Sequence, residues 1–297
     1  MDCKTIIFMR TILIFVVITT LSVQLSTAQK SCFTTTLQKP KLVKLWETDS
    51  ILNDLESAIY DKVNNTIYVT SINGHWLKPN GKGFISKVDV NGKITNHKWI
   101  DDIDGPTGTA IYNNKLFTAD FDKVLEIDLE SSKIIRKHKI EGVIRINDLT
   151  VDKQGVIYGG CSKSGKLFAL EKGKQTILKD DLYWPNGLLY ENENILIGLG
   201  DKTISNYNLQ TKTSKTIAEG ISNPDGIVAI GNGDYLISSW EGMIHYVKKN
   251  GDKTLLLDTT KEKVNAADIT YIRELKMVLV PAMSKHKLIA YRLTDEH

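Results

Sequence analysis

A residue with a side-chain oxygen recurs at matching positions along the chain. Asn147, Asn186 and Asp225 are spaced 39 residues apart, and the last two stand in "PNG" and "PDG". Each is followed by a short apolar run, a polar turn and a second apolar run. Carboxylate and amide oxygens are the ligands that Ca²⁺ and other hard divalent cations take. If the fold brings these residues together, they have the chemistry of a cation site.

The same position can be followed through six units of the sequence. The units open at Glu56, Thr107, Asn147, Asn186, Asp225 and Asp268. A third and usually a fourth β-like run complete each unit, such as "KVLEIDL" and "KIIRKHKI", and the repeat length is about 40 residues. Recurrence at a fixed period is typical of repeat architectures, in which each unit is one small supersecondary structure.

The elements that must position these residues are predicted to be β-strands. The runs alternate apolar and polar residues, are rich in Ile, Val, Leu and Tyr, and break at "NGK", "KQG" and "GNG". Four strands per repeat indicate a propeller blade. The sequence therefore predicts an all-β, six-bladed β-propeller, whose ring is closed when the N-terminal run "KLVKLWET" (41–48) supplies the outer strand that the last unit lacks. A solenoid or a β-sandwich is the alternative.

In a propeller the first strand of each blade lines the central channel, so the recurring residues would form a ring around the axis. Two carboxylates and two amides would neutralise a divalent cation and leave positions open for water or substrate. The competing interpretation is that "NG" and "DG" are only turn signals. Their constant place just before an apolar strand favours the cation site, because other turn residues fall between strands.

Four motifs that open these units resemble those of the SMP-30/gluconolactonase/LRE-like family, also called regucalcin-like proteins. They are "ESAIYD", "RIND", "PNG" and "PDG", and the resemblance covers most of residues 45–295. The family fold is a six-bladed propeller with one divalent ion in the channel. The resemblance implies that Glu56, Asn186 and Asp225 ligate this ion. It also implies that Asn147 ligates the ion or contacts substrate, and that Arg145 binds substrate.

The family's typical reaction is the hydrolysis of a lactone. The resemblance therefore implies a metal-dependent hydrolase whose substrate is a lactone, such as a sugar-acid-like lactone, or a related small ester. The ion would polarise the ester carbonyl, and Asp225 would take a proton from the attacking water. Ca²⁺ is the expected ion, with Zn²⁺, Mn²⁺ and Mg²⁺ as alternatives. The opening "ESA" replaces the usual E-G-P, and the family's further acidic substrate contact has no counterpart, which leaves the substrate open.

Other functions and roles also stay open at this point. A non-catalytic propeller that binds a protein or carbohydrate around a structural metal is one alternative, and lyase- or synthase-like chemistry of the strictosidine-synthase-like kind is another. The aromatic residues in loops near the blade ends either wall a pocket or pack between blades. They are His75, Trp76, Trp184 and Trp240.

The N-terminus is predicted to be a secretory signal peptide (1–28). Lys4 and Arg10 precede the apolar run "TILIFVVITTLSV", and the small residues of "STA" lead to a cleavage site after Ala28. Met9 is an alternative start. A membrane anchor is the competing interpretation, but the run is short for a span of about 20 residues. The protein is therefore expected to be secreted or periplasmic, with no membrane span once the signal is removed.

A tail (29–40) and one propeller domain (41–297) follow. The two remaining cysteines, Cys32 and Cys161, could pair in an exported protein, but their spacing does not decide it. With 41% apolar and 25% charged residues and a net charge of +3, the composition is that of a globular protein without a basic face for nucleic acid.

Sequence motifs for other enzyme classes are lacking. The stretch "GCSKSGKL" nearly fits a phosphate-binding loop, but Leu167 replaces the required hydroxyl. The sequence contains no G-x-S-x-G, no H-E-x-x-H and no C-x-x-C. A nucleophile-elbow hydrolase and a zincin are therefore disfavoured.

Overall fold

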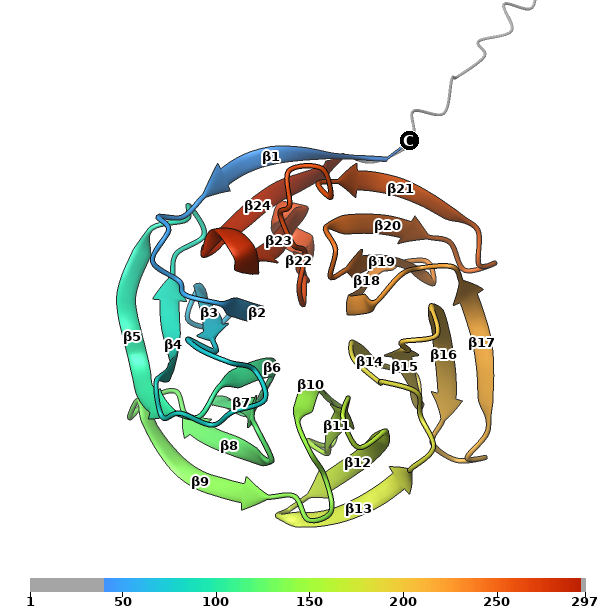
Figure 1. Cartoon of the computed structure of the whole chain (residues 1–297), viewed down its shortest axis with the longest axis horizontal. Helices are drawn as coiled ribbons and strands as arrows, with labels where there is room; N and C mark the ends of the chain where they lie inside the picture. The colour runs from blue at the N-terminus through green and yellow to red at the C-terminus, as the bar shows by residue number, and fades with distance from the viewer. Residues whose placement is uncertain (1–39, 295–297) are drawn as a thin grey trace, which may run out of the picture. The chain divides into compact units, whose positions relative to one another are not determined.

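The computed structural model describes residues 40–294, which form six four-stranded antiparallel sheets arranged in a ring (Figure 1). The prediction of an all-β, six-bladed β-propeller is confirmed. No helix within this range is long and apolar enough to cross a membrane. The predicted signal peptide (1–28) and Cys32 lie outside the described residues.

In blades 1 to 3 the strands run outward from the centre in sequence order. Blade 1 contains β2 (Leu55–Asp61), β3 (Thr66–Ser71), β4 (Gly83–Val88) and β5 (Ile94–Ile103). Blade 2 contains β6 (Pro106–Tyr112), β7 (Lys115–Asp120), β8 (Lys123–Asp128) and β9 (Lys133–Lys139). Blade 3 contains β10 (Ile146–Val151), β11 (Ile157–Cys161), β12 (Lys166–Glu171) and β13 (Lys174–Lys179).

Blades 4 and 5 repeat this order. Blade 4 contains β14 (Leu188–Glu191), β15 (Asn194–Gly198), β16 (Thr203–Asn208) and β17 (Ser214–Glu219). Blade 5 contains β18 (Pro224–Gly231), β19 (Asp234–Ser239), β20 (Met243–Val247) and β21 (Lys253–Asp258).

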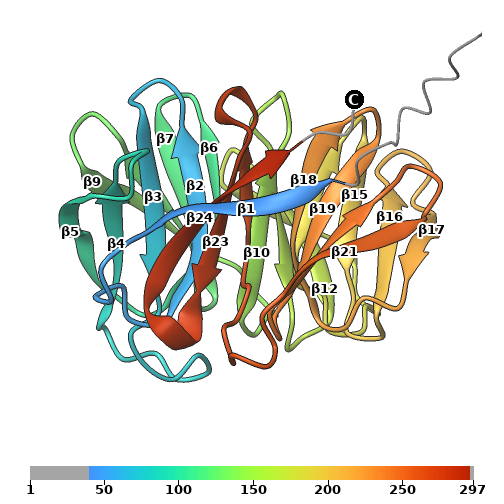
Figure 2. The same ribbon diagram turned by 90° about the horizontal axis from the view of Figure 1, so that it is seen from above.

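Blade 6 is assembled from both ends of the described chain. It contains β22 (Thr270–Ile272), β23 (Met277–Ala282), β24 (Lys287–Thr294) and, as its outer strand, β1 (Lys41–Glu47), with the 3₁₀ turns η1 (Arg273–Leu275) and η2 (Met283–Lys285) between strands. Strand β1 pairs antiparallel with β24, from Lys41 opposite Thr294 to Glu47 opposite Ile289 (Figure 2). The predicted closure by the N-terminal strand is confirmed, and β1 covers the outward edge of β24 in this blade.

The hydrophobic core is divided among the interfaces between blades. Each of six apolar clusters draws its side chains from two neighbouring sheets. Phe117 of blade 2 packs in one cluster with Phe168 of blade 3, and Leu236 of blade 5 shares another with Val278 of blade 6. Since apolar burial contributes about 25 cal/mol per Å², each blade is stabilised chiefly by its neighbours. The inner strands are thereby held in fixed positions around the axis.

Trp46 connects the closing strand to blade 1. Its indole N–H donates to the Val90 carbonyl at 3.0 Å. Its ring covers Gly92, where an added Cβ would lie 2.6 Å from the indole. Strand β1 therefore joins the two ends of the ring. It pairs with the sheet of blade 6 and contacts blade 1 through the Trp46 side chain.

We expect Trp46→Ala to lower the free energy of unfolding by about 2 kcal/mol, because it removes a half-buried aromatic contact and a hydrogen bond at the ring closure. Urea denaturation followed by far-UV circular dichroism measures this change. Val43→Ala is the matched control, because Val43 lies exposed on the same strand. Equal stabilities of the two variants would contradict a closing role for Trp46.

Candidate functional site

The recurring polar position lies where the inner strand of each blade begins, and strand pairing is irregular there. In blades 1, 2, 3 and 5 the register with the second strand shifts across this position. The shifts fall between Leu55 and Ala58, Pro106 and Thr109, Ile146 and Asp148, and Pro224 and Ile227. Bulges of this kind re-aim a side chain and are frequent beside active sites.

A second backbone irregularity lies just before the recurring position. Two residues before the recurring position, the backbone has a positive φ in five of the blades. The residues are Asp54 (48°), Gly105 (155°), Arg145 (58°), Trp184 (52°) and Asn223 (36°). A left-handed residue other than glycine costs on the order of 1–3 kcal/mol, and residues of this kind occur in tight turns and cluster at active sites. The same strained turn therefore introduces the inner strand in most of the ring.

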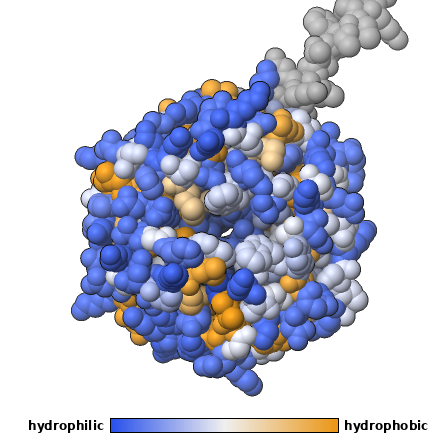
Figure 3. Space-filling model, in the orientation of Figure 1, coloured by the Kyte–Doolittle hydropathy of each residue, from blue (hydrophilic) through white to orange (hydrophobic). Residues whose placement is uncertain are grey.

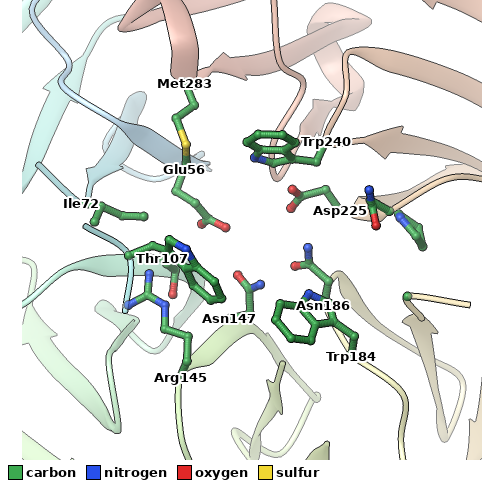
Figure 4. A pocket seen from close by; sticks show the side chains of 14 residues that line it. Glu56, Ile72, Thr107, Arg145, Asn147, Trp184, Asn186, Asp225, Trp240 and Met283 are labelled. Carbon is green, nitrogen blue, oxygen red and sulfur yellow. The ribbon is translucent and has the colours of Figure 1, made fainter. Parts of the chain in front are cut away.

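The side chains at the recurring position converge on one cavity of about 410 Å³ at one end of the channel. The cavity is lined by Glu56, Thr107, Asn147, Asn186 and Asp225. In Figure 4 the carboxyl groups of Glu56 and Asp225 and the amides of Asn147 and Asn186 point into a common space from four blades. The ring face is hollowed at its centre (Figure 3). Five of the six expected positions are thus brought together.

The sixth expected position, Asp268, was wrongly assigned. Asp268 forms a parallel bridge with Ser57, and its N–H donates to the Glu56 carbonyl at 3.0 Å. Asp268 therefore lies level with the residue that follows Glu56, and Ala267 takes the recurring position in blade 6. Ala267 lies 42 residues after Asp225, whereas the two preceding spacings of the recurring position are 39 residues. Asp268 lines a second cavity, of about 450 Å³, at the other end of the inner strands.

Oxygen atoms without protein partners face this common space. Glu56 Oε2, Asn186 Oδ1 and Asp225 Oδ1 are buried, and none has a hydrogen-bond partner. Buried polar atoms are nearly always paired, so each of these calls for a ligand. No three His, Cys, Asp or Glu side chains form a metal cluster in residues 40–294, so a cation here would need the amide oxygens as well. The oxygen set fits a hard divalent cation.

The amide of Asn147 is oriented by a serine. Asn147 Nδ2 donates to Ser162 Oγ at 2.8 Å, and the Ser162 hydroxyl donates to the Pro185 carbonyl at 2.7 Å. Because the nitrogen branch is bound on this side, the carbonyl oxygen remains for a ligand in the cavity. Ser162 thus determines which atom of Asn147 faces the other oxygens.

The site and its surroundings contain more acidic than basic side chains. Burial raises the pKa of Glu56 well above its ordinary value, and repulsion from Asp225, Asp268 and Asp148 raises it further, while Arg145 opposes the shift. Burial and the Asp268 charge likewise raise the pKa of Asp225. The charged forms are disfavoured in the free protein, and a bound cation would stabilise them.

A second layer directly behind the site joins neighbouring inner strands. Asp148 accepts hydrogen bonds from its neighbour Leu149 N and, across the blade boundary, from Leu188 N, both at 2.6 Å. The Ser57 hydroxyl donates to Asp268 Oδ2 at 2.5 Å. Gly187 is required here, because an added Cβ would lie 1.6 Å from the Asp225 carbonyl oxygen. The strands that carry the site therefore touch, which fixes the separation of their side chains.

Arg145 lies in the cavity wall but is only 1% exposed. Its Nη1 donates to the Gly105 carbonyl at 3.0 Å, and its guanidinium lies 5.9 Å from the centre of the Phe121 ring. Burial lowers its pKa, whereas Glu56 and Asp120 raise it. At least one donor of the predicted substrate-binding fork is therefore used inside the protein, and Arg145 partly neutralises Glu56.

The mouth of the cavity is aromatic. Trp76, Trp184 and Trp240 line it, whereas His75 is absent from the lining. The sequence did not identify several further residues of this region, among them Ile72, Ser162, Asn223 and Met283. Asn223 had a usable signal, because it stands two residues before Asp225, as Arg145 stands before Asn147. Ile72 and Met283 had none.

No protein-family model matches the chain, and no curated protein matches it. Its structure is similar to that of XC5397 from Xanthomonas campestris, described as a gluconolactonase important in glucose secondary metabolic pathways. The TM-score is 0.66 at 15% identity, over 87% of this chain and 91% of that one. A chain of a nidogen/laminin complex has a TM-score of 0.62 at 16% identity, over 72% and 83%. Identities this low establish a shared fold only.

We expect Ser162→Ala to weaken Ca²⁺ binding about tenfold, because the Asn147 amide loses the partner that orients its oxygen. Isothermal titration of Ca²⁺ into chelator-treated protein measures the affinity. Ser162→Thr keeps a hydroxyl and is expected to restore most of the affinity. Unchanged affinity in Ser162→Ala would show that Asn147 is not a ligand or is oriented by other contacts.

The free protein is also expected to lose stability as pH rises. The pKa of Asp268 is raised to about 7, mainly by burial, whereas an unfolded Asp titrates near ~3.9. Between these values the unfolded chain gives up its proton first, so the free energy of unfolding falls with increasing pH. Asp268→Asn removes this dependence and still offers an oxygen to the Ser57 hydroxyl.

The measurement is urea denaturation of both proteins in chelator across that pH window. Wild type should lose at least about 1 kcal/mol relative to Asp268→Asn, the equivalent of one pKa unit. Parallel stability curves for the two proteins would contradict the raised pKa.

Proposed function

We propose that the protein is a divalent-cation-dependent hydrolase that opens a lactone or a related small ester. The observation that carries the proposal is the set of unpartnered oxygens from Glu56, Asn186 and Asp225 at the base of the cavity. Two buried carboxylates with free oxygens are a costly arrangement in a protein without a ligand. An arrangement of this kind favours a cation as the missing partner.

Glu56, Asn147, Asn186 and Asp225 would hold the cation, with Ca²⁺ as the expected ion and Zn²⁺, Mn²⁺ or Mg²⁺ as alternatives. These four side chains leave part of the coordination of Ca²⁺ open to the cavity, since that ion takes six to eight oxygens. When bound, the cation supplies a Lewis acid that polarises an ester carbonyl and stabilises negative charge on its oxygen.

The side chains of this chain would carry out the remaining steps. Asp225 accepts a proton from a water molecule as the water oxygen bonds to the acyl carbon. The bond between that carbon and the ring oxygen then breaks, and the ring oxygen takes up a proton, so one water is consumed and a hydroxy acid is formed. Asn147 and the buried Arg145 line the same space and would orient the substrate.

The similarity to a described gluconolactonase supports a lactone as the substrate, although it extends at this identity to the fold alone. A non-catalytic binding propeller is the second candidate, and the similarity to a chain of a nidogen/laminin complex favours it. A binding propeller has no need for unpaired carboxylates at the base of a cavity, so the hydrolase is preferred. The N-terminal sequence supports export, and we propose that the protein acts outside the cytoplasm.

We expect Ca²⁺ to support hydrolysis of at least one member of a lactone panel and a chelator to abolish it. Asp225→Asn is expected to lower kcat by roughly 100-fold or more, because the base is lost and a charged cation ligand is replaced by a neutral amide. Rates are measured by pH-indicator assay with each of the four cations. Asp180→Asn, an exposed position away from the cavity, is the matched control and should keep wild-type activity.

The stability of the same variants separates a lost site from a lost fold. Asp225→Asn should leave the cation-free protein as stable as wild type or more so, because it removes a buried charge. Calcium should raise the melting temperature of wild type by more than that of the variant. If wild type hydrolyses no lactone with any cation, the hydrolase proposal fails, even where calcium binds.

A further inference from the structure

The rim of the cavity is built from tryptophans on three separate loops. Trp76 lies between β3 and β4, Trp184 between β13 and β14, and Trp240 directly after β19. Trp184 is 38% exposed and Trp240 is 45% exposed. Ile72 and Met283 complete an apolar collar above the polar base (Figure 4). Exposed indoles around a cavity are typical of a ligand-binding surface.

The position of Trp184 is specified by its surroundings. Its backbone φ is 52°, a strained value for a tryptophan. Gly200 packs against it so closely that an added Cβ would lie 2.8 Å from the Trp184 Cβ. The indole meets the Trp76 ring edge-on at 5.9 Å, and Lys163 Nζ lies 5.6 Å from its centre. These three contacts hold Trp184 at the mouth of the cavity, where its side chain stays partly exposed.

Four polar residues of the wall each have a hydrogen-bond donor that is already bound within the protein. Thr107 Oγ1 donates to the Ile146 carbonyl at 3.1 Å, and Asn147 Nδ2 donates to Ser162. Asn223 Nδ2 donates to Glu241, and Arg145 donates to the Gly105 carbonyl. These donors are not available to a substrate with many hydroxyl groups, which would lose hydration on entering.

We propose that the substrate is an uncharged lactone or ester with an apolar body, such as an aromatic-fused or alkyl-chain lactone, and not a polyhydroxylated sugar-acid lactone. This inference rests on the proposed function and specifies its substrate class. The ester group faces the oxygen-lined base, and the apolar body lies between the indoles of the rim. Burial of that body contributes about 25 cal/mol per Å² of apolar surface. The cavity, at about 410 Å³, has the size of a small-molecule site.

The main experiment compares dihydrocoumarin, an alkyl-substituted γ-lactone and δ-gluconolactone with the calcium-loaded protein. We expect kcat/KM for the two apolar lactones to exceed that for gluconolactone at least tenfold. Trp184→Ala should lower kcat/KM for dihydrocoumarin about tenfold, mainly through KM, because the indole contacts the body and not the ester. Tyr183→Ala is the matched control, since Tyr183 is the exposed neighbour of Trp184 and does not line the cavity.

Equal or faster hydrolysis of gluconolactone would overturn the inference while leaving the proposed function intact. An unchanged KM in both Trp184→Ala and Trp240→Ala would also overturn it. A second experiment does not depend on turnover. Coumarin and glucose are titrated calorimetrically into the protein from which cations have been removed by a chelator. Preferential binding of coumarin, weakened in Trp184→Ala, supports an apolar ligand even if no lactone is hydrolysed. Absence of any preference for coumarin contradicts it.

Discussion

The cost of buried negative charge is the constraint on which this site depends. Glu56, Asp148, Asp225 and Asp268 all lie in the wall of the channel, and each has a raised pKa for which burial is the first cause. Arg145 offsets only one of these charges. Desolvated carboxylates that repel one another would move apart or take up protons in a flexible chain. The ring prevents the first response, because the apolar clusters between blades and the glycine contacts behind the site fix the inner strands.

The same local backbone produces both the charges and the mouth. In blades 3, 4 and 5 a left-handed residue stands two positions before the recurring residue, and the side chains of both line the cavity. In blade 3 the pair is Arg145 and Asn147, and in blade 4 it is Trp184 and Asn186. The second residue of each pair carries a side-chain oxygen toward the axis, whereas the first is an arginine, a tryptophan or an asparagine. One repeated turn can therefore keep an oxygen-lined base constant while the rim changes.

Much of this could be predicted from the sequence, because the information was periodic. Strand alternation and a repeat length of about 40 residues predicted six blades and the closing strand, and the residue at the start of each unit identified five of the six ring positions. The prediction was wrong in blade 6, where the recurring position comes 42 residues after Asp225 and no local pattern marks Ala267 instead of Asp268. Contacts between distant segments were also beyond reach. The bond from Asn147 to Ser162 depends on the register of β10 and β11, and the place of Met283 beside the cavity depends on how blades pack.

An apolar rim and a charged base reinforce one another. Indoles around the mouth exclude water from the space above Glu56 and Asp225 once a ligand fills it, and interactions between charges grow stronger as the local dielectric constant falls. The attraction between a cation and the carboxylates and the polarisation of a bound carbonyl both increase in that environment. A ligand with an apolar body would thus improve the electrostatics of the base by its presence. In this cavity the side chains that select the ligand would also strengthen the chemistry applied to it.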